Sequence, residues 1–280
     1  MAAIAAVSAV AVGGCGAANT VKQAVDPVAK AAEVTSKVPG YKMSAVVSIN
    51  TPAGAVKTTM SGVMDRAAHT GAMISSESIA GHAFTMSERL SGLTVYMDAS
   101  GIPGADQITH GKKWLKMDMS RAFGSMGLGS LSTSSSDPSQ FVDYLRAVSD
   151  STKKVGTDSV RGVATTRYHA IIDLRKYPNI VPASQKATAK HAISTMEAVL
   201  GAHTMAMDVW IDGSKLVRRM SFDMPECVNN QKLNMSMTMD LYDYGPQPAT
   251  TLPPSSQAFD LTPLLSASMQ HVKLGCSSSA

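Results

Sequence analysis

The stretch from Leu233 to Leu241 alternates apolar and polar side chains without a break. Its apolar positions are Leu233, Met235, Met237, Met239 and Leu241. Because successive side chains of a β-strand point to opposite faces, this pattern predicts a strand with one apolar face and one face in water. A chain that contains such strands must bury their apolar faces, and this favours a sheet-based fold.

Two earlier stretches repeat the pattern. One places Met205, Met207, Val209 and Ile211 on a single face, and the other places Leu216, Met220, Phe222 and Met224 on a single face. Asp212-Gly213-Ser214 lies between them, and Asp-Gly between alternating stretches predicts a hairpin. The chain has 19 Met against 5 Phe and 2 Trp. Methionine is adaptable, so these faces suit either an ordinary core or a surface that accepts ligands of variable shape.

Composition limits the class of protein. The 280 residues fit one large all-β domain or two small ones, and the regular spacing of the strand-like stretches favours one. Charged residues make up 16% of the chain and the formal net charge is +4. Lys and Arg are scattered and aromatic residues are few, so a groove for nucleic acid is not indicated.

The first fifteen residues predict a secretion signal. An apolar stretch from Ile4 to Val12 is followed by Gly13-Gly14-Cys15, and it is too short to span a bilayer. Val-Gly-Gly-Cys resembles the bacterial lipobox, which implies lipidation of Cys15 and anchoring to the bacterial cell membrane outside the cytoplasm. No Lys or Arg precedes the apolar stretch, and a start further upstream would account for this. Residues 16–38 predict a tether with a short helix over 27–36.

The main domain, 39–245, predicts a long series of strands. Turn signals separate strand-like stretches at 41–50, 56–65, 70–77, 82–89, 93–98, 113–118, 152–157 and 162–173. With the stretches described above, this makes roughly eleven strands. Helical spacing predicts helices over 137–148 and 183–200, and a Ser/Gly-rich loop at 124–136 precedes the first. Residues 246–280 predict a Pro/Ser-rich tail, and residues 246–256 are expected to leave the sheet.

Several motifs occur together in this order. They are Gly-Lys-Lys-Trp-Leu-Lys-Met-Asp at 111–118, Asp-Pro-Ser-Gln at 137–140, the stretch 155–168, Val-Trp-Ile-Asp at 209–212 and Leu-Val-Arg-Arg-Met at 216–220. This combination resembles the actinobacterial LppX/LprA/LprF/LprG lipoproteins, which are related in fold to LolA and LolB. The resemblance implies a mainly antiparallel α+β fold. It would be a strongly curved half-barrel, with two or three helices over its concave face and an apolar cavity for acyl chains between them.

The leading hypothesis is a lipid-anchored carrier for a membrane glycolipid or phospholipid, with an envelope transport protein as a possible partner. The expected lipid-binding residues are Met205, Met207, Val209, Leu216, Met220, Phe222, Met235, Met237 and Met239. The alternative is an envelope sensor or structural lipoprotein of the same fold that acts through protein partners. A hydrolase ranks third, because no Gly-x-Ser-x-Gly elbow is present.

The remaining candidate sites are few. Cys227 and Cys276 can pair in an exported protein, or they can stay as two thiols. The seven histidines lack a metal-ligand spacing, so no metal, cofactor or catalytic residue is predicted. Arg218 and Arg219 are expected on opposite sides of a strand, where one could meet a lipid phosphate. Trp114 and Trp210 are expected to be packing residues.

Overall fold

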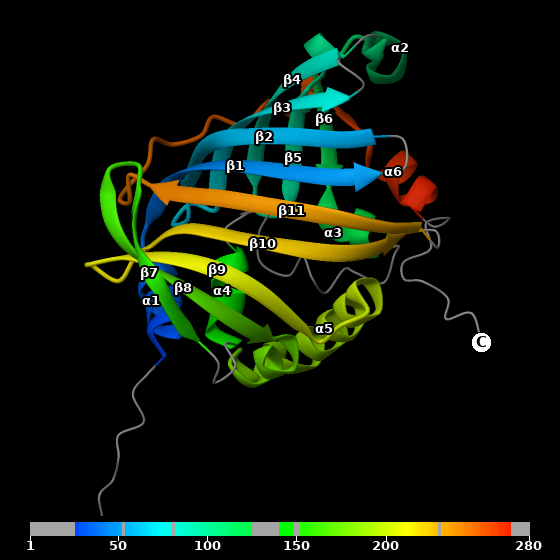
Figure 1. Ribbon diagram of the computed structural model, residues 1–280. Helices are drawn as coiled ribbons and strands as arrows, with labels where there is room; N and C mark the ends of the chain where they lie inside the picture. The colour runs from blue at the N-terminus through cyan, green and yellow to red at the C-terminus, as the bar shows by residue number, and fades with distance from the viewer. Residues whose placement is uncertain are drawn as a thin grey trace, which may run out of the picture.

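Twelve strands in the described part of the chain form one curved, open sheet (Figure 1). The structure is a computed structural model that describes residues 26–51, 54–79, 82–102, 104–124, 140–147, 152–228 and 231–269. The strands are β1 Gly40–Thr51, β2 Gly54–Asp65, β3 Thr70–Ile79, β4 His82–Ser91, β5 Thr94–Asp98, β6 Trp114–Asp118, β7 Lys153–Val160, β8 Val163–Asp173, β9 Thr204–Asp212, β10 Val217–Val228, β11 Gln231–Tyr242 and β12 Ala258–Asp260. The predicted half-barrel of mainly antiparallel strands is confirmed.

The strand order is β12-β6-β5-β4-β3-β2-β1-β11-β10-β9-β8-β7. Strands β1 to β6 form one continuous antiparallel ribbon and β7 to β11 form a second, so neighbours in sequence are neighbours in space. The two ribbons meet where β1 pairs with β11. In that pairing Ala45 lies opposite Met239 and Ser44 lies opposite Asp240. The Asp212-Gly213-Ser214 hairpin predicted from the sequence joins β9 to β10.

Part of the C-terminal segment that was expected as a tail adds a short strand to the sheet. Residues 258–260 form β12, which pairs in parallel with β6. The Thr262 hydroxyl accepts a hydrogen bond from the Asp118 backbone N–H at 2.9 Å, and the Lys116 carbonyl accepts one from the Leu261 N–H at 2.9 Å. Both bonds involve backbone groups at the edge of the sheet. A strand of only three residues has no sequence pattern from which this pairing could be predicted.

Two glycines allow β2 and β3 to approach closely. A Cβ added at Gly62 would lie well inside 3.0 Å of the Ala72 carbonyl oxygen, and one added at Gly71 would lie equally close to the Met64 sulfur. Glycine is therefore required at Gly62, because a side chain there would push the backbone of β3 away, whereas a side chain at Gly71 would displace the Met64 side chain.

The helices are α1 Pro27–Thr35, α2 Ala105–Thr109, α3 Met119–Gly124, α4 Gln140–Tyr144, α5 Lys186–Leu200 and α6 Thr262–Met269. Five 3₁₀ segments accompany them: η1 Ala99–Gly101, η2 Leu145–Ala147, η3 Leu174–Asn179, η4 Ala183–Gln185 and η5 Ser255–Gln257. The predicted helix over 183–200 is present, and Gly201 ends it in the left-handed conformation as expected. The described part of the predicted helix over 137–148 consists of α4 and η2.

Helix α1 is part of the folded core. The Asp26 carboxylate accepts hydrogen bonds from the Val28 and Ala29 backbone N–H groups, and Pro27 occupies the first helical position. Val28, Ala31 and Ala32 are fully buried, and the helix packs against β9 and β10. The segment expected to act as a tether thus contains a packed helix, which begins at Pro27.

Candidate functional site

The nine expected lipid-binding residues lie on or beside three adjacent strands. Eight belong to β9, β10 and β11, and Leu216 directly precedes β10. Register places Val209 opposite Met220, and Met220 opposite Met239. We call this side of the sheet, on which α1, η2 and α5 pack, the inner face.

Most of these nine residues are already packed against protein. Val209 and Met239 are fully buried, and Met207 and Met220 are nearly so. They share one core cluster with residues of α1, η2 and α5. Only Leu216 and Met235 are partly exposed. Their role in lipid binding remains a prediction.

One end of the inner face is sealed, and we call it the closed end. Here Tyr41, Met43 and Leu241 are at most 1% exposed. The buried Thr35 hydroxyl, at the C-terminal end of α1, accepts a hydrogen bond from the Val217 N–H at 2.9 Å. Helix α1 therefore closes this end through both apolar packing and a buried hydrogen bond.

The opposite end is less covered, and we call it the open end. It carries the β1–β2, β3–β4 and β10–β11 connections, away from α1 in Figure 1. Apolar side chains of the inner face lie partly exposed at this end, and they are Ile49, Val56, Met86, Met224 and Met235. Phe84, on the same face of β4, is 39% exposed. The inner face thus changes from sealed to accessible along the length of its strands.

A polar pair interrupts the inner face on β3 and β4. The Ser75 hydroxyl, which is buried, donates a hydrogen bond to the Glu88 carboxylate at 2.6 Å. The sequence analysis did not single out these residues. The alternation in β3, which puts Ser75 and Glu77 on the same face as Met73, was the signal that could have identified polar positions there.

The outer face of β7 to β11 carries an ordered array of charged and aromatic side chains. The Trp210 indole N–H donates to the Asp158 carboxylate at 3.0 Å, and the Arg167 guanidinium lies 5.0 Å from the Trp210 ring centre. Arg167 also pairs with Asp208, which contacts the ring nitrogen of His169. Trp210, expected as a packing residue, is therefore also a hydrogen-bond donor.

This array lowers two carboxyl pKa values. The hydrogen bond from Trp210 is the main cause that holds the pKa of Asp158 below its usual 3.8. For Asp208, burial raises the pKa, but hydrogen bonds from Arg167 and His169 outweigh it and leave the pKa lowered. Both groups are consequently ionised at neutral pH.

Arg218 and Arg219 differ in their surroundings, and a β-bulge between Val217 and Arg219 interrupts the alternation on which their expected placement on opposite sides of the strand rested. Arg219 donates to both oxygens of Asp240, at 2.6 and 2.9 Å, on the outer face. Arg218 sits at a β-bulge and donates to Asp212 at 2.6 Å. On β6, Trp114 lies under the cationic groups of Arg89 and Lys113, each 5.7 Å from its ring centre.

Several predicted features lie outside the described residues. These are the signal sequence with Cys15, the Ser/Gly-rich loop at 125–136, and Cys276; the side chain of Cys227 is also not described. Within the described ranges, no three His, Cys, Asp or Glu side chains gather as they would around a metal ion. No helix in those ranges is long and apolar enough to cross a membrane.

The fold and its surfaces define an open half-barrel with a methionine-rich inner face. No family model matches the chain. A curated relative, an uncharacterised 31.2 kDa protein in the rplA-rplJ intergenic region of Streptomyces griseus, is 29% identical over 165 residues. The match covers 56% of this chain and 51% of that protein, so the chain spans about half the length of this relative.

Among solved structures, the chain is similar to lipoproteins of the group that its motifs resemble. LppX of Mycobacterium tuberculosis is 12% identical, with 80% of this chain and 95% of that chain covered and a TM-score of 0.46. LprF of Mycobacterium bovis is 15% identical, with coverage of 81% and 95% and a TM-score of 0.39. Both TM-scores are below 0.5.

Proposed function

We propose that the protein is a non-enzymatic extracytoplasmic carrier that holds the acyl chains of a glycolipid or phospholipid against its inner face. The observation that supports this is the change in burial along that face. Apolar side chains that point inward are sealed at the closed end and partly exposed at the open end. Exposed apolar surface of this kind, on the inward side of a sheet, is typical of a ligand site.

The energetics of acyl chains fit this arrangement. Each buried CH₂ contributes about 0.8 kcal/mol, so ten methylenes contribute about 8 kcal/mol without any polar recognition. A chain that enters at the open end meets Phe84, Met224 and Met235 first, and Met237 lies one step deeper on the same row. The fully buried Val209 and Met239 form the fixed wall behind them. Methionine suits the entry because it adapts to chains of different shape.

The proposal includes an anchor. Lipidation of Cys15 would hold the protein on the outer side of the cell membrane, and cargo would be passed on to an envelope partner by mass action. No covalent step is involved.

One observation favours the second candidate, a sensor or structural lipoprotein. Seven of the nine expected lipid-binding residues are packed against the protein's own side chains. A face filled in this way needs no ligand, and the protein would then act through protein contacts.

Native mass spectrometry followed by organic extraction separates the two candidates. The protein would carry Cys15→Ala, which removes the acceptor of the anchor, and would be incubated with vesicles of diacyl phospholipid. A carrier gives discrete adducts that extract as diacyl lipid. Met235→Asp, on the inner face at the open end, is expected to abolish them, whereas Asn234→Asp, exposed on the outer face of the same strand, is expected to retain them. A bare protein, or equal adducts in both variants, would overturn the carrier.

A further inference from the structure

A row of polar side chains crosses the otherwise apolar inner face of β2, β3 and β4 (Figure 1). We call it the polar track, and its members are Thr58, Ser75, Glu77 and Glu88. Glu77 pairs with Thr58 on one side and with Phe84 on the other, and Ser75 pairs with Met86. A ligand on this part of the inner face would therefore contact polar and apolar groups side by side.

The two glutamates lie at different depths along the track. Glu88 pairs with Met73, which is four residues before Glu77 on β3. Because a strand rises about 3.3 Å per residue, the two positions are about 13 Å apart along the face. Glu77 is the one nearer the open end, beside the partly exposed Phe84. The track thus follows the length of the strands and does not gather its carboxylates at one point.

The carboxylates of the track have few partners within the protein. The Ser75 hydroxyl donates to one oxygen of Glu88 at 2.6 Å. In the described residues, no other hydrogen bond or ion pair reaches the Glu88 carboxylate, and none reaches that of Glu77. Both glutamates are partly exposed. Since a carboxylate only accepts hydrogen bonds, its remaining acceptor positions need donors from water or from a ligand.

The surrounding strands supply no cation to match these carboxylates. Over the described residues of β1 to β6, register places no Lys or Arg on the inner face. Lys42, Lys57 and Arg89 belong to these strands and fall on the outer face. The track therefore disfavours a ligand that brings a negative charge beside it.

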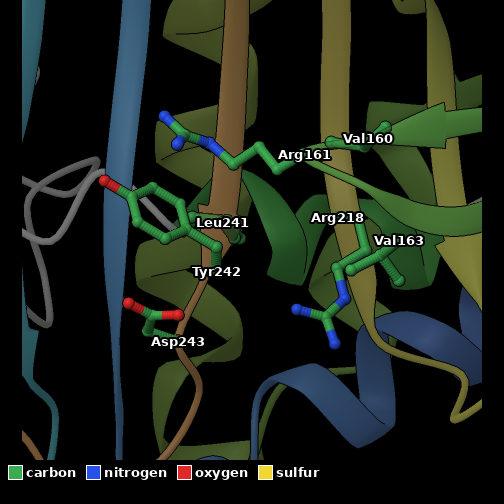
Figure 2. Close-up of a pocket in the computed structure, with 7 residues that line it drawn as sticks. All are labelled: Val160, Arg161, Val163, Arg218, Leu241, Tyr242 and Asp243. Atoms are coloured by element: carbon green, nitrogen blue, oxygen red, sulfur yellow. The ribbon is translucent and has the colours of Figure 1, made fainter.

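The cations at the closed end are engaged elsewhere. Arg161 and Arg218 line a pocket there of about 310 Å³, and Figure 2 shows their guanidinium groups pointing away from one another. Arg161 stacks on the Tyr242 ring, 3.9 Å from the ring centre, and donates to the Ser44 hydroxyl at 2.9 Å. Arg218 pairs with Asp212 at 2.6 Å. Each of these cations thus has its own partners, in contrast to the carboxylate of Glu77.

We propose that the polar track binds the hydroxyl groups of an uncharged lipid, with Glu77 and Glu88 accepting the hydrogen bonds. This rests on the proposed function and narrows the cargo to lipids whose polar part bears hydroxyl groups and no phosphate or carboxylate. A phospholipid still binds through its acyl chains, with its phosphate outside at the open end. A hydroxyl group fits better than an ammonium group. The two carboxylates are too far apart to share one cation, and a cation costs more to remove from water.

Native mass spectrometry of the Cys15→Ala protein tests this preference. Four lipids with the same unsaturated chain are offered in equal amounts from phosphatidylcholine vesicles: monooleoylglycerol, methyl oleate, oleic acid and oleylamine. Adducts of monooleoylglycerol are expected to exceed those of methyl oleate by about tenfold, because hydrogen bonds to charged groups are strong, and oleic acid is expected to bind least. Equal adducts of monooleoylglycerol and methyl oleate, or a predominance of oleylamine, would overturn this proposal alone. A protein without any lipid adduct, phosphatidylcholine included, would overturn the carrier itself.

A pair of variants locates the preference on the track. Glu77→Leu removes a carboxylate that no hydrogen bond holds in the described chain, and it is expected to remove most of the tenfold preference while methyl oleate binds as before. Asp223→Leu, at an exposed carboxylate on the outer face of β10, is the matched control and is expected to keep the preference. A folded Glu77→Leu variant with the full preference would contradict the proposal.

A second measurement needs no variant in the track. Carbodiimide with glycine ethyl ester modifies accessible carboxyl groups, and peptide mass spectrometry reports the rate at each one. Bound monooleoylglycerol is expected to slow modification of Glu77 more than methyl oleate does at the same occupancy, and to leave Asp223 unchanged. Equal rates at Glu77 with either lipid bound would show that the hydroxyl groups do not reach the track.

Discussion

The two ends of the inner face are built from the same strands and nearly the same residue types, yet they differ in what covers them. At the closed end, α1 supplies apolar side chains and a buried hydrogen-bond acceptor, and the methionines there belong to a packed core. At the open end, side chains of the same kind remain partly in water. A row of methionines therefore belongs to the core where other elements cover it and forms a candidate ligand surface where they do not. The sequence of the row does not specify which elements cover it.

The largest effect is expected from truncating a methionine at the closed end. Met239→Ala removes a fully buried side chain and is expected to cost about 3 to 4 kcal/mol in the free energy of unfolding. Met235→Ala, four residues earlier on the same strand and partly exposed, is expected to cost less than about 1 kcal/mol. Urea denaturation of both variants tests the difference, and equal losses would show that the two ends are packed alike.

A somewhat smaller loss of unfolding free energy is expected when one methyl group is added to β2. Gly62→Ala places a Cβ against the backbone of β3, and overpacking of this kind costs about 2 kcal/mol. Gly156→Ala on β7 is the matched control, because nothing lies within 4 Å of its added Cβ. Thermal unfolding followed by circular dichroism compares the two variants. An unchanged midpoint for Gly62→Ala would refute the tight approach of β2 and β3.

Removing the buried hydrogen bond at the closed end is expected to cost less unfolding free energy than either Met239→Ala or Gly62→Ala. Thr35→Val keeps the shape of the side chain but leaves the buried Val217 N–H without its acceptor, at a cost of about 1 to 2 kcal/mol. Thr59→Val changes an exposed threonine on β2 and is expected to be nearly neutral. Hydrogen exchange at the Val217 amide adds a direct readout, since its protection is expected to fall only in Thr35→Val.

The smallest effect concerns pH on the outer face. Because the folded-state pKa of Asp158 is lowered below 3.8, its ionised form contributes stability that is present above 3.8 and is lost as the pH falls through the folded-state pKa. In a Trp114→Phe background, Trp210 fluorescence is expected to change with a midpoint below pH 3.8 while circular dichroism stays constant. Asp158→Asn is expected to remove this step and Asp208→Asn to keep it. A midpoint at or above 3.8 would contradict the assignment.

The fold could be predicted largely from the alternation of side chains. The strands with long alternating patterns, such as β2 and β11, were placed within a few residues, because one buried face imposes period two on the sequence. Strand β12 was missed because three residues carry no measurable period. The packing of α1 was also missed, since small residues such as Ala31 and Ala32 look the same in a tether and in a tight helix contact.

The candidate sites were harder to predict. Alternation placed Met207 and Met237 on one face, but it did not tell which part of that face the helices cover. At the turn of the β7–β8 hairpin, Arg161 contacts Asp240 and Tyr242 of β11. These two residues lie about 80 positions later in the sequence. A hairpin that extends beyond its neighbouring strand has no characteristic sequence pattern. The contacts of Arg161 with β11 are therefore visible only in the folded structure.

The junction of β1 with β11 has a consequence for how the chain reaches this structure. Each ribbon is built from hairpins between neighbours in sequence, which close short loops and form quickly. The single pairing between the ribbons joins residues nearly 200 positions apart, such as Ala45 and Met239, and it carries a much larger loop-closure entropy. Until β11 has been made, β1 has an unpaired edge that could join another chain, so the interval before this pairing is when the protein is most exposed to aggregation.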